Sequence, residues 1–157
     1  MATLATVKWY LRIPPPLWTL AFLLIAYGLE WSGAIPPIML MHSLPAAILL
    51  AVAGLALAVS AVRKFFVEGT EIEPASAANK KLVTNGPFRF TRNPMYLGLI
   101  LVSLGIAFYM GTLAFFAVPV LVFLLCNFLF IPFEEEKMQR QHGNPYTEYM
   151  HRVRRWI

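Results

Sequence analysis

The sequence predicts an all-α integral membrane protein with four transmembrane helices and a cytoplasmic helical segment after them. The first observation is composition: 59% of the 157 residues are hydrophobic and 13% are charged, whereas soluble domains have about 45–50% and about 25%. The second is a set of four apolar stretches, and the third is a strongly uneven distribution of lysine and arginine. Together they exclude an ordinary soluble monomer and a disordered chain, and the length fits one domain over residues 1–157.

The four apolar stretches predict membrane spans over residues 15–32, 45–63, 94–110 and 113–131. A spanning helix needs about 20 residues; the second and fourth stretches are long enough alone, and the first and third borrow flanking residues. Pro132 is expected to break the fourth helix, so that a new helix starts at the glutamates that follow.

Basic residues predict the orientation. All 13 lysines and arginines lie before the first span, between Arg63 and Arg92, or after the fourth span, and residues 32–44 and 111–112 contain none. Because cytoplasmic loops collect lysine and arginine, we expect a multi-pass protein of the cell inner (cytoplasmic) membrane with both termini and loop 64–93 in the cytoplasm. The net charge of +5 then reflects topology, and the expected partner is the lipid bilayer and not nucleic acid.

One polar motif opens the third span. Asn93 is a good N-cap and Pro94 suits the first helical position. Free N–H groups at that helix start, with Arg92 beside them, favour an anionic ligand. Gly98 and Gly105 would let a neighbour or a ligand approach the backbone. The alternative on local grounds is a capped membrane helix whose arginines extend to the interface.

Two further motifs follow the fourth span. Residues 134–136 are three glutamates, which either match the dipole of a new helix or bind a cationic or polyhydroxyl ligand. In the C-terminal segment 132–157, Tyr146, Tyr149 and Val153 have helical spacing, which predicts an amphipathic interfacial helix anchored at the headgroups by Trp156 and arginines. No metal site is expected, because the chain has one cysteine and scattered histidines.

Three separated motifs carry a family resemblance. The run GPFRFTRNPMYLGLILVSLG, the glutamates, and the pattern G-x-x-Y-x-x-Y-x-x-R-V-R-R-W resemble the isoprenylcysteine carboxyl methyltransferase and phospholipid methyltransferase family over roughly Val83 to Ile157. The family pattern commonly reads Arg-His-Pro-x-Tyr-x-Gly. Asn93 replaces the histidine, a departure that bears on the prenylcysteine substrate more than on the cofactor.

The resemblance implies a methyltransferase that uses S-adenosylmethionine. By position in the motifs it implies cofactor-binding roles for Arg92, Asn93, Pro94, Tyr96, Leu97, Gly98, Glu134, Glu135, Tyr146 and Tyr149. The expected acceptor is lipid-like or small and apolar, with a carboxylate, amine or thiol as the reacting group. A carboxylate acceptor would be held by Arg152, and an amine or thiol would lose its proton to a glutamate such as Glu135.

The competing interpretation is a non-enzymatic four-helix membrane protein, such as a transporter or an assembly subunit. A transporter should carry ionisable residues at mid-membrane. The predicted spans instead contain mainly Ser60, Ser103 and Asn127 as polar positions, and the charged groups lie at the membrane edge. This distribution favours an enzyme that combines a soluble cofactor with an acceptor from the lipid phase.

Overall fold

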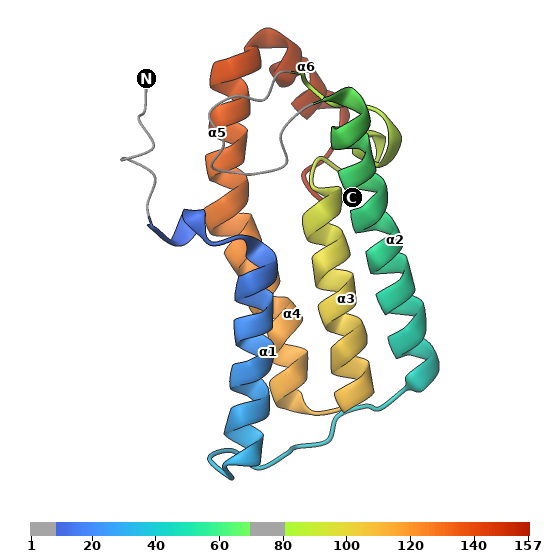
Figure 1. Cartoon of the computed structure of the whole chain (residues 1–157), viewed down its shortest axis with the longest axis vertical. Helices are drawn as coiled ribbons and strands as arrows, with labels where there is room; N and C mark the ends of the chain where they lie inside the picture. Colours follow the sequence, from blue (N-terminus) through green and yellow to red (C-terminus); the bar gives the residue numbers. More distant parts are fainter. Residues whose placement is uncertain (1–8, 70–80) are drawn as a thin grey trace.

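The computed structural model describes residues 9–69 and 81–157, and this part of the chain is helical with no β-strand (Figure 1). The prediction of an all-α chain is therefore confirmed. The elements, in chain order, are η2 (Trp9–Arg12), α1 (Pro15–Trp31), α2 (Leu44–Glu68), η3 (Gly86–Arg89), α3 (Pro94–Met110), α4 (Leu113–Leu125), η4 (Cys126–Phe130), α5 (Ile131–His142) and α6 (Asn144–Arg152).

Helix α2 is longer than predicted. It begins after Ser43, whose hydroxyl accepts the Ala46 N–H, and it ends at Gly69 in the left-handed conformation with φ 64°. The expected loop 64–93 therefore starts with helix. Lys64 and Glu68 form an ion pair at 3.7 Å across one turn, which supports this extension. Residues 70–80 of the expected loop, which include Lys80, lie outside the described residues, as does Lys8.

The fourth predicted helix does not break at Pro132, which corrects the sequence-based expectation. Helices α4, η4 and α5 follow one another as a single helix, Leu113–His142, of 30 residues. The five residues of η4 form a π-helix, in which the Ile131 N–H donates to the Cys126 carbonyl five residues earlier. Proline removes one N–H and crowds the carbonyl four residues back; the wider π-turn just before Pro132 accommodates both effects.

The helices pack side by side in the order α2, α3, α4, α1. Buried side chains from α1, α3 and the long helix form the main core, which includes Ala107, Val118, Val122 and Phe130. A second cluster joins α2, the segment before α3, and α6. At the end of the bundle opposite α6, the Leu40 N–H donates to the Gly111 carbonyl at 2.8 Å. The α1–α2 connection therefore lies against the α3–α4 turn.

Two described helices are long and apolar enough to cross a membrane, Leu44–Glu68 and Leu113–His142, and α3 is apolar but has 17 residues. Large apolar side chains on the outer faces of α1, α2, α4 and η4 are exposed; they include Leu20, Leu24, Leu49, Val52, Val120 and Phe128. An apolar surface of this extent is not stable in water. These helices indicate a membrane protein.

Candidate active site

A cavity of about 580 Å³ lies at the end of the bundle where η3 and α6 are found. Its walls come from the start of α1, the later half of α2, the first half of α3, and helices α5 and α6. Charged and polar side chains line one part, notably Arg92, Glu134, Glu135 and Lys137, and the rest is apolar. The polar motifs that are far apart in the sequence thus meet around one space.

The long helix places the three consecutive glutamates in different surroundings. Glu134 and Glu135 line the cavity, and the hydroxyl of the buried Tyr96 on α3 donates a hydrogen bond to Glu134. Glu136 is exposed and pairs with Arg140 one turn later. Two of the three acids therefore belong to the cavity, the same two that the family pattern implies.

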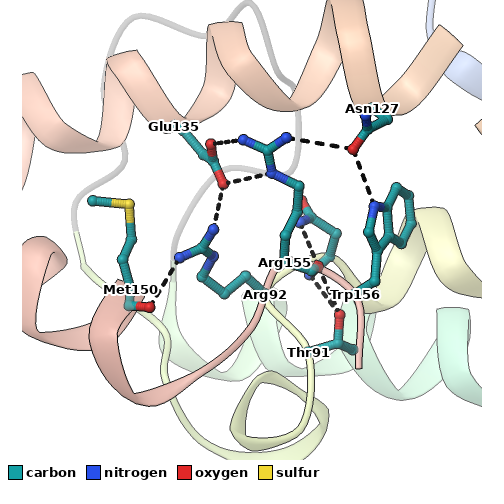
Figure 2. A network of polar contacts seen from close by, with 8 residues as sticks. Thr91, Arg92, Asn127, Glu135, Met150, Arg155 and Trp156 are labelled. Carbon is teal, nitrogen blue, oxygen red and sulfur yellow. Dashed lines mark hydrogen bonds and ion pairs between the residues drawn. The ribbon is translucent and has the colours of Figure 1, made fainter. Parts of the chain in front are cut away.

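Glu135 accepts hydrogen bonds from two arginines, as Figure 2 shows. Its Oε1 accepts from Arg92 Nη2 at 2.7 Å and from Arg155 Nε at 3.2 Å, and its Oε2 accepts from Arg155 Nη2 at 2.5 Å. The side chains of Arg92 and Glu135 are 12% and 18% exposed, so the pair is shielded from most water. Such charge-assisted hydrogen bonds are about twice as strong as neutral ones.

Asn93 is at the N-cap position of α3, but its side chain makes no capping hydrogen bond. Its Nδ2 instead donates to the Arg155 carbonyl at 2.8 Å. The Thr91 hydroxyl donates to the same carbonyl at 3.1 Å, and the Arg92 N–H donates to the Arg154 carbonyl at 3.0 Å. The segment before α3 thus holds residues near the end of the sequence, a long-range contact that local capping rules do not predict.

The residues after α6, Val153–Ile157, are called the tail segment here. The Trp156 Nε1–H donates to Asn127 Oδ1 at 3.1 Å, and Arg155 Nη1 donates to the same oxygen at 3.3 Å (Figure 2). The Trp156 ring also packs against Phe123, with ring centroids 5.1 Å apart. Trp156 and Arg155 thus contact the long helix, and the anchoring of this segment at lipid headgroups stays a prediction.

The tyrosine face of helix α6 packs against the protein. Tyr146 and Tyr149 are buried against Ala61, Val83 and Phe88, and the Tyr149 hydroxyl donates to the Phe88 carbonyl at 2.7 Å. Val153 has an extended backbone and ends the helix. The prediction of a helix with these tyrosines on one face is confirmed, but the partner of that face is the second core cluster.

The tyrosines of α6 remain protonated at ordinary pH. Burial, with a further contribution from Glu135, raises the pKa of Tyr146 to about 12 despite the opposing charge of Arg92. Burial and the neighbouring Tyr146 raise the pKa of Tyr149 well above its usual value. At physiological pH both can donate hydrogen bonds, and neither can act as a phenolate base.

The structure brings most of the predicted site residues together. Nine line the cavity: Arg92, Asn93, Pro94, Tyr96, Gly98, Glu134, Glu135, Tyr146 and Tyr149. Leu97 does not, and Leu99 lies in the wall in its place. Arg152 is exposed at the end of α6 and outside the cavity wall. The assigned catalytic and binding roles stay predictions. Within residues 9–69 and 81–157, no group of three His, Cys or acidic side chains can hold a metal ion.

Sequence reasoning missed two residues that are linked to the cavity through Glu135, namely Arg155 and Asn127. The only signal for Asn127 was its polarity inside an apolar span. Arg155 is one of three arginines near the end of the sequence, and no local pattern distinguishes it from the other two. Its role depends on a fold that returns the tail segment to the start of α3.

Comparison with known families assigns the chain to one of them. The family model described as phospholipid methyltransferase matches residues 43–145, which run from the cap of α2 to the start of α6. The chain belongs to the phospholipid methyltransferase family. The protein is therefore a membrane methyltransferase by family, and the matched region contains Arg92, Glu134 and Glu135 but not the tail segment. Comparisons with curated proteins and with solved structures gave no match.

Proposed function

We propose that this chain transfers a methyl group from S-adenosylmethionine to a lipid-like or small apolar acceptor at the cytoplasmic surface of a membrane. One observation carries the proposal: a single cavity joins the charged residues of the family-matched region to an apolar wall between helices. A soluble, charged cofactor and an acceptor from the lipid phase need these two environments next to each other.

The donor set of the cavity fits the cofactor. Arg92 Nε is buried and has no hydrogen-bond acceptor among the described residues, and a buried unpaired donor is costly. A carboxylate in the cavity would satisfy it. Glu134 can accept hydrogen bonds from an ammonium or from ribose hydroxyls. The volume of about 580 Å³ is within the usual range for small-molecule sites, about 300–1,000 Å³.

S-adenosylmethionine supplies, when bound, a methyl carbon made electrophilic by its sulfonium. The chain then has to orient the reactants and exclude water, which can account for a large part of a rate enhancement. Arg92 would bind the carboxylate, and Tyr96 would hold the Glu134 carboxylate through its hydroxyl. Tyr146 and Tyr149 on α6 would cover the polar part of the cavity.

The apolar wall would receive the acceptor. Leu55, Ala58 and Val62 of α2 line it together with Val102 of α3 and the prolines that begin α1. A carboxylate acceptor would need only a neighbouring cation. An amine or thiol would need a base for its proton, and Glu134 is the cavity carboxylate without an arginine partner.

The orientation is part of the proposal. We infer four spans, formed by α1, α2, α3 and the apolar part of the long helix, with both ends of the chain in the cytoplasm. Support comes from the charges: residues 32–43 and 111–112 at the far end contain no lysine or arginine. The cavity and the basic residues around it are at the other end, as expected for a cytoplasmic surface.

Calorimetric titration of the purified protein with S-adenosylmethionine and S-adenosylhomocysteine tests the proposal, followed by transfer of a labelled methyl group to added lipids and thiols. Glu134→Gln should weaken binding of both compounds at least tenfold, the loss expected for one charged hydrogen bond. Glu136→Gln is the matched control and should bind like wild type, because Glu136 is outside the cavity. Absence of binding to wild type would refute the proposal.

A further inference from the structure

Asn127 is a polar residue inside the apolar part of the long helix, and its side-chain oxygen accepts hydrogen bonds from two residues of the tail segment. The donors are Arg155 Nη1 at 3.3 Å and Trp156 Nε1 at 3.1 Å. Polar groups at such positions are costly unless they are paired. This one is paired with a segment that the fold could otherwise leave free, which suggests that it keeps that segment in place.

The π-helix explains how Asn127 and Glu135 reach the same arginine. In a regular α-helix each residue advances about 100°, so residues eight apart differ by about 80° in direction. A π-turn adds a residue to one turn, which removes most of that difference. Asn127 and Glu135 then share a face, and Figure 2 shows both side chains directed at Arg155. The same shift turns Glu134 toward Tyr96.

Arg155 connects this anchor to the cavity. It donates two hydrogen bonds to Glu135, and Glu135 in turn accepts from Arg92 Nη2. Arg92 also donates from Nη1 to the Met150 carbonyl at 3.2 Å, in the last turn of α6. Both Nη atoms of Arg92 are thereby held by the protein, and its Nε is left without an acceptor among the described residues.

We propose that Asn127 and Arg155 are positioning residues of the active site. Asn127 holds the tail segment, Arg155 fixes Glu135, and Glu135 orients Arg92, whose side chain lines the cavity where an anionic group would bind. Both oxygens of Glu135 accept hydrogen bonds from arginines, so Glu135 also acts on the ligand through Arg92. The ligand in this argument rests on the proposed function, whereas the docking of the tail segment does not.

The test uses two readouts on the full chain in detergent. Trypsin cleavage after Arg152, the exposed last residue of α6 that every variant below keeps, followed by intact mass, reports whether the tail segment is docked. Calorimetry with S-adenosylhomocysteine reports binding. Arg155→Gln is compared with Arg154→Gln, which removes the same charge one residue away; the Arg154 side chain is exposed, and its backbone carbonyl is kept. Asn127→Leu removes the accepting oxygen, and Asn127→Asp retains one.

We expect Arg155→Gln and Asn127→Leu to release the tail segment about ten times faster and to weaken binding about tenfold, the effect of one charged hydrogen bond. Arg154→Gln should match wild type in both readouts, and Asn127→Asp should restore both. Circular dichroism should be the same for all four variants, which separates positioning from misfolding.

Two results would overturn the inference. If the tail segment is released but binding is unchanged, the segment does not position the site. If cleavage of Asn127→Leu equals that of wild type, Asn127 is not the anchor. Failure of wild type to bind S-adenosylhomocysteine would instead refute the proposed function and the positioning role together, and the cleavage comparison would still decide whether Asn127 docks the segment.

Discussion

Gly54 of α2 and Gly98 of α3 face each other so closely that neither position has room for a side chain. A Cβ on Gly54 would lie 2.5 Å from the Gly98 carbonyl oxygen, and a Cβ on Gly98 would lie 2.6 Å from the Gly54 oxygen. Gly105 meets the Ala47 carbonyl in the same way one level further along. Small residues that allow such contact hold membrane helices together through packing. The wall of the cavity that α2 and α3 share depends on this contact.

Gly54→Ala and Gly98→Ala should each lower the free energy of unfolding by about 1–3 kcal/mol, because the added methyl forces the two backbones apart. SDS titration in mixed micelles measures this change. Gly28→Ala is the matched control on α1, where a Cβ would meet nothing within 4 Å. It should leave stability unchanged or raise it by up to about 1 kcal/mol, since alanine favours helix. Equal effects at all three positions would contradict the packing role.

Glu134→Gln should mainly weaken ligand binding, whereas Glu135→Gln should mainly lower stability. Glu135 pairs with Arg92 and Arg155, so its neutralisation should lower the free energy of unfolding by about 1–3 kcal/mol by leaving two guanidinium groups less well paired. Among the described residues no salt bridge joins Glu134 to an arginine, and its substitution should lower ligand affinity with a smaller loss of stability. Unfolding titrations and calorimetry on both variants check this, and a larger stability loss for Glu134→Gln would contradict the assignment.

The effects of substitutions at Asn93 should depend on whether the side-chain N–H₂ donor is kept, and not on whether the new residue is a good helix cap. Asn93→Asp keeps a good N-cap residue but replaces the N–H₂ that donates to the Arg155 carbonyl with an acceptor. It should release the tail segment to trypsin faster than wild type and bind S-adenosylmethionine more weakly. Asn93→Ser, also a good cap, should behave similarly because serine is too short to reach. Wild-type behaviour in both variants would restore the capping interpretation.

Arg92→Lys should fold and insert normally while losing cofactor affinity. Lysine keeps the charge but has a single ammonium in place of the planar group, which here contacts Glu135 and the Met150 carbonyl with different nitrogens. We expect affinity to fall about tenfold or more, measured by calorimetry with S-adenosylhomocysteine. Arg89→Lys is the control, because Arg89 lies in η3 outside the cavity wall.

Fusions of a topology reporter should place residues 157 and 39 on opposite sides of the membrane. The distribution of lysine and arginine favours this arrangement, with position 157 in the cytoplasm and Met39 in the connection that lacks basic residues. A cytoplasmic phosphatase fusion is inactive and an external one is active, so the pair gives opposite signals. Finding both positions on the same side would exclude the four-span arrangement.

The fold class could be predicted from the sequence because it depends on composition and on the length of apolar stretches, which are local properties. The start of α2 was also predictable to within one residue from the apolar stretch that begins at Pro45, and the start of α3 from Asn93–Pro94. The continuation of the helix through Pro132 was not predictable. The sequence shows that a proline disrupts regular hydrogen bonding, but it does not show whether a π-turn relieves the disruption. The helix therefore continued where a break was expected.

The site was predictable to a similar extent. Motif order brought Arg92, Tyr96 and the first two glutamates to one place, since Arg92 and Tyr96 lie at the start of the third predicted span and the glutamates follow the end of the fourth. The partners of Glu135 could not be predicted, because Arg152, Arg154 and Arg155 look alike in sequence and only the path of the tail segment selects one. Asn127 has the same difficulty: its role needs a residue that follows it by 28 positions.

The helices of this bundle differ greatly in length. α1 and α3 have 17 residues each and rise about 25 Å, less than the hydrocarbon thickness of about 30 Å, whereas the helix Leu113–His142 has 30 residues and rises about 45 Å. A bilayer adapts to short helices by local thinning. Thinning beside α1 and α3 brings the headgroup level toward the prolines that begin α1 and line the cavity. With a lipid acceptor, as proposed above, hydrophobic mismatch would set how deep the reacting group of the lipid lies relative to Glu134, and acyl-chain length in the host membrane would then influence which lipids reach the site.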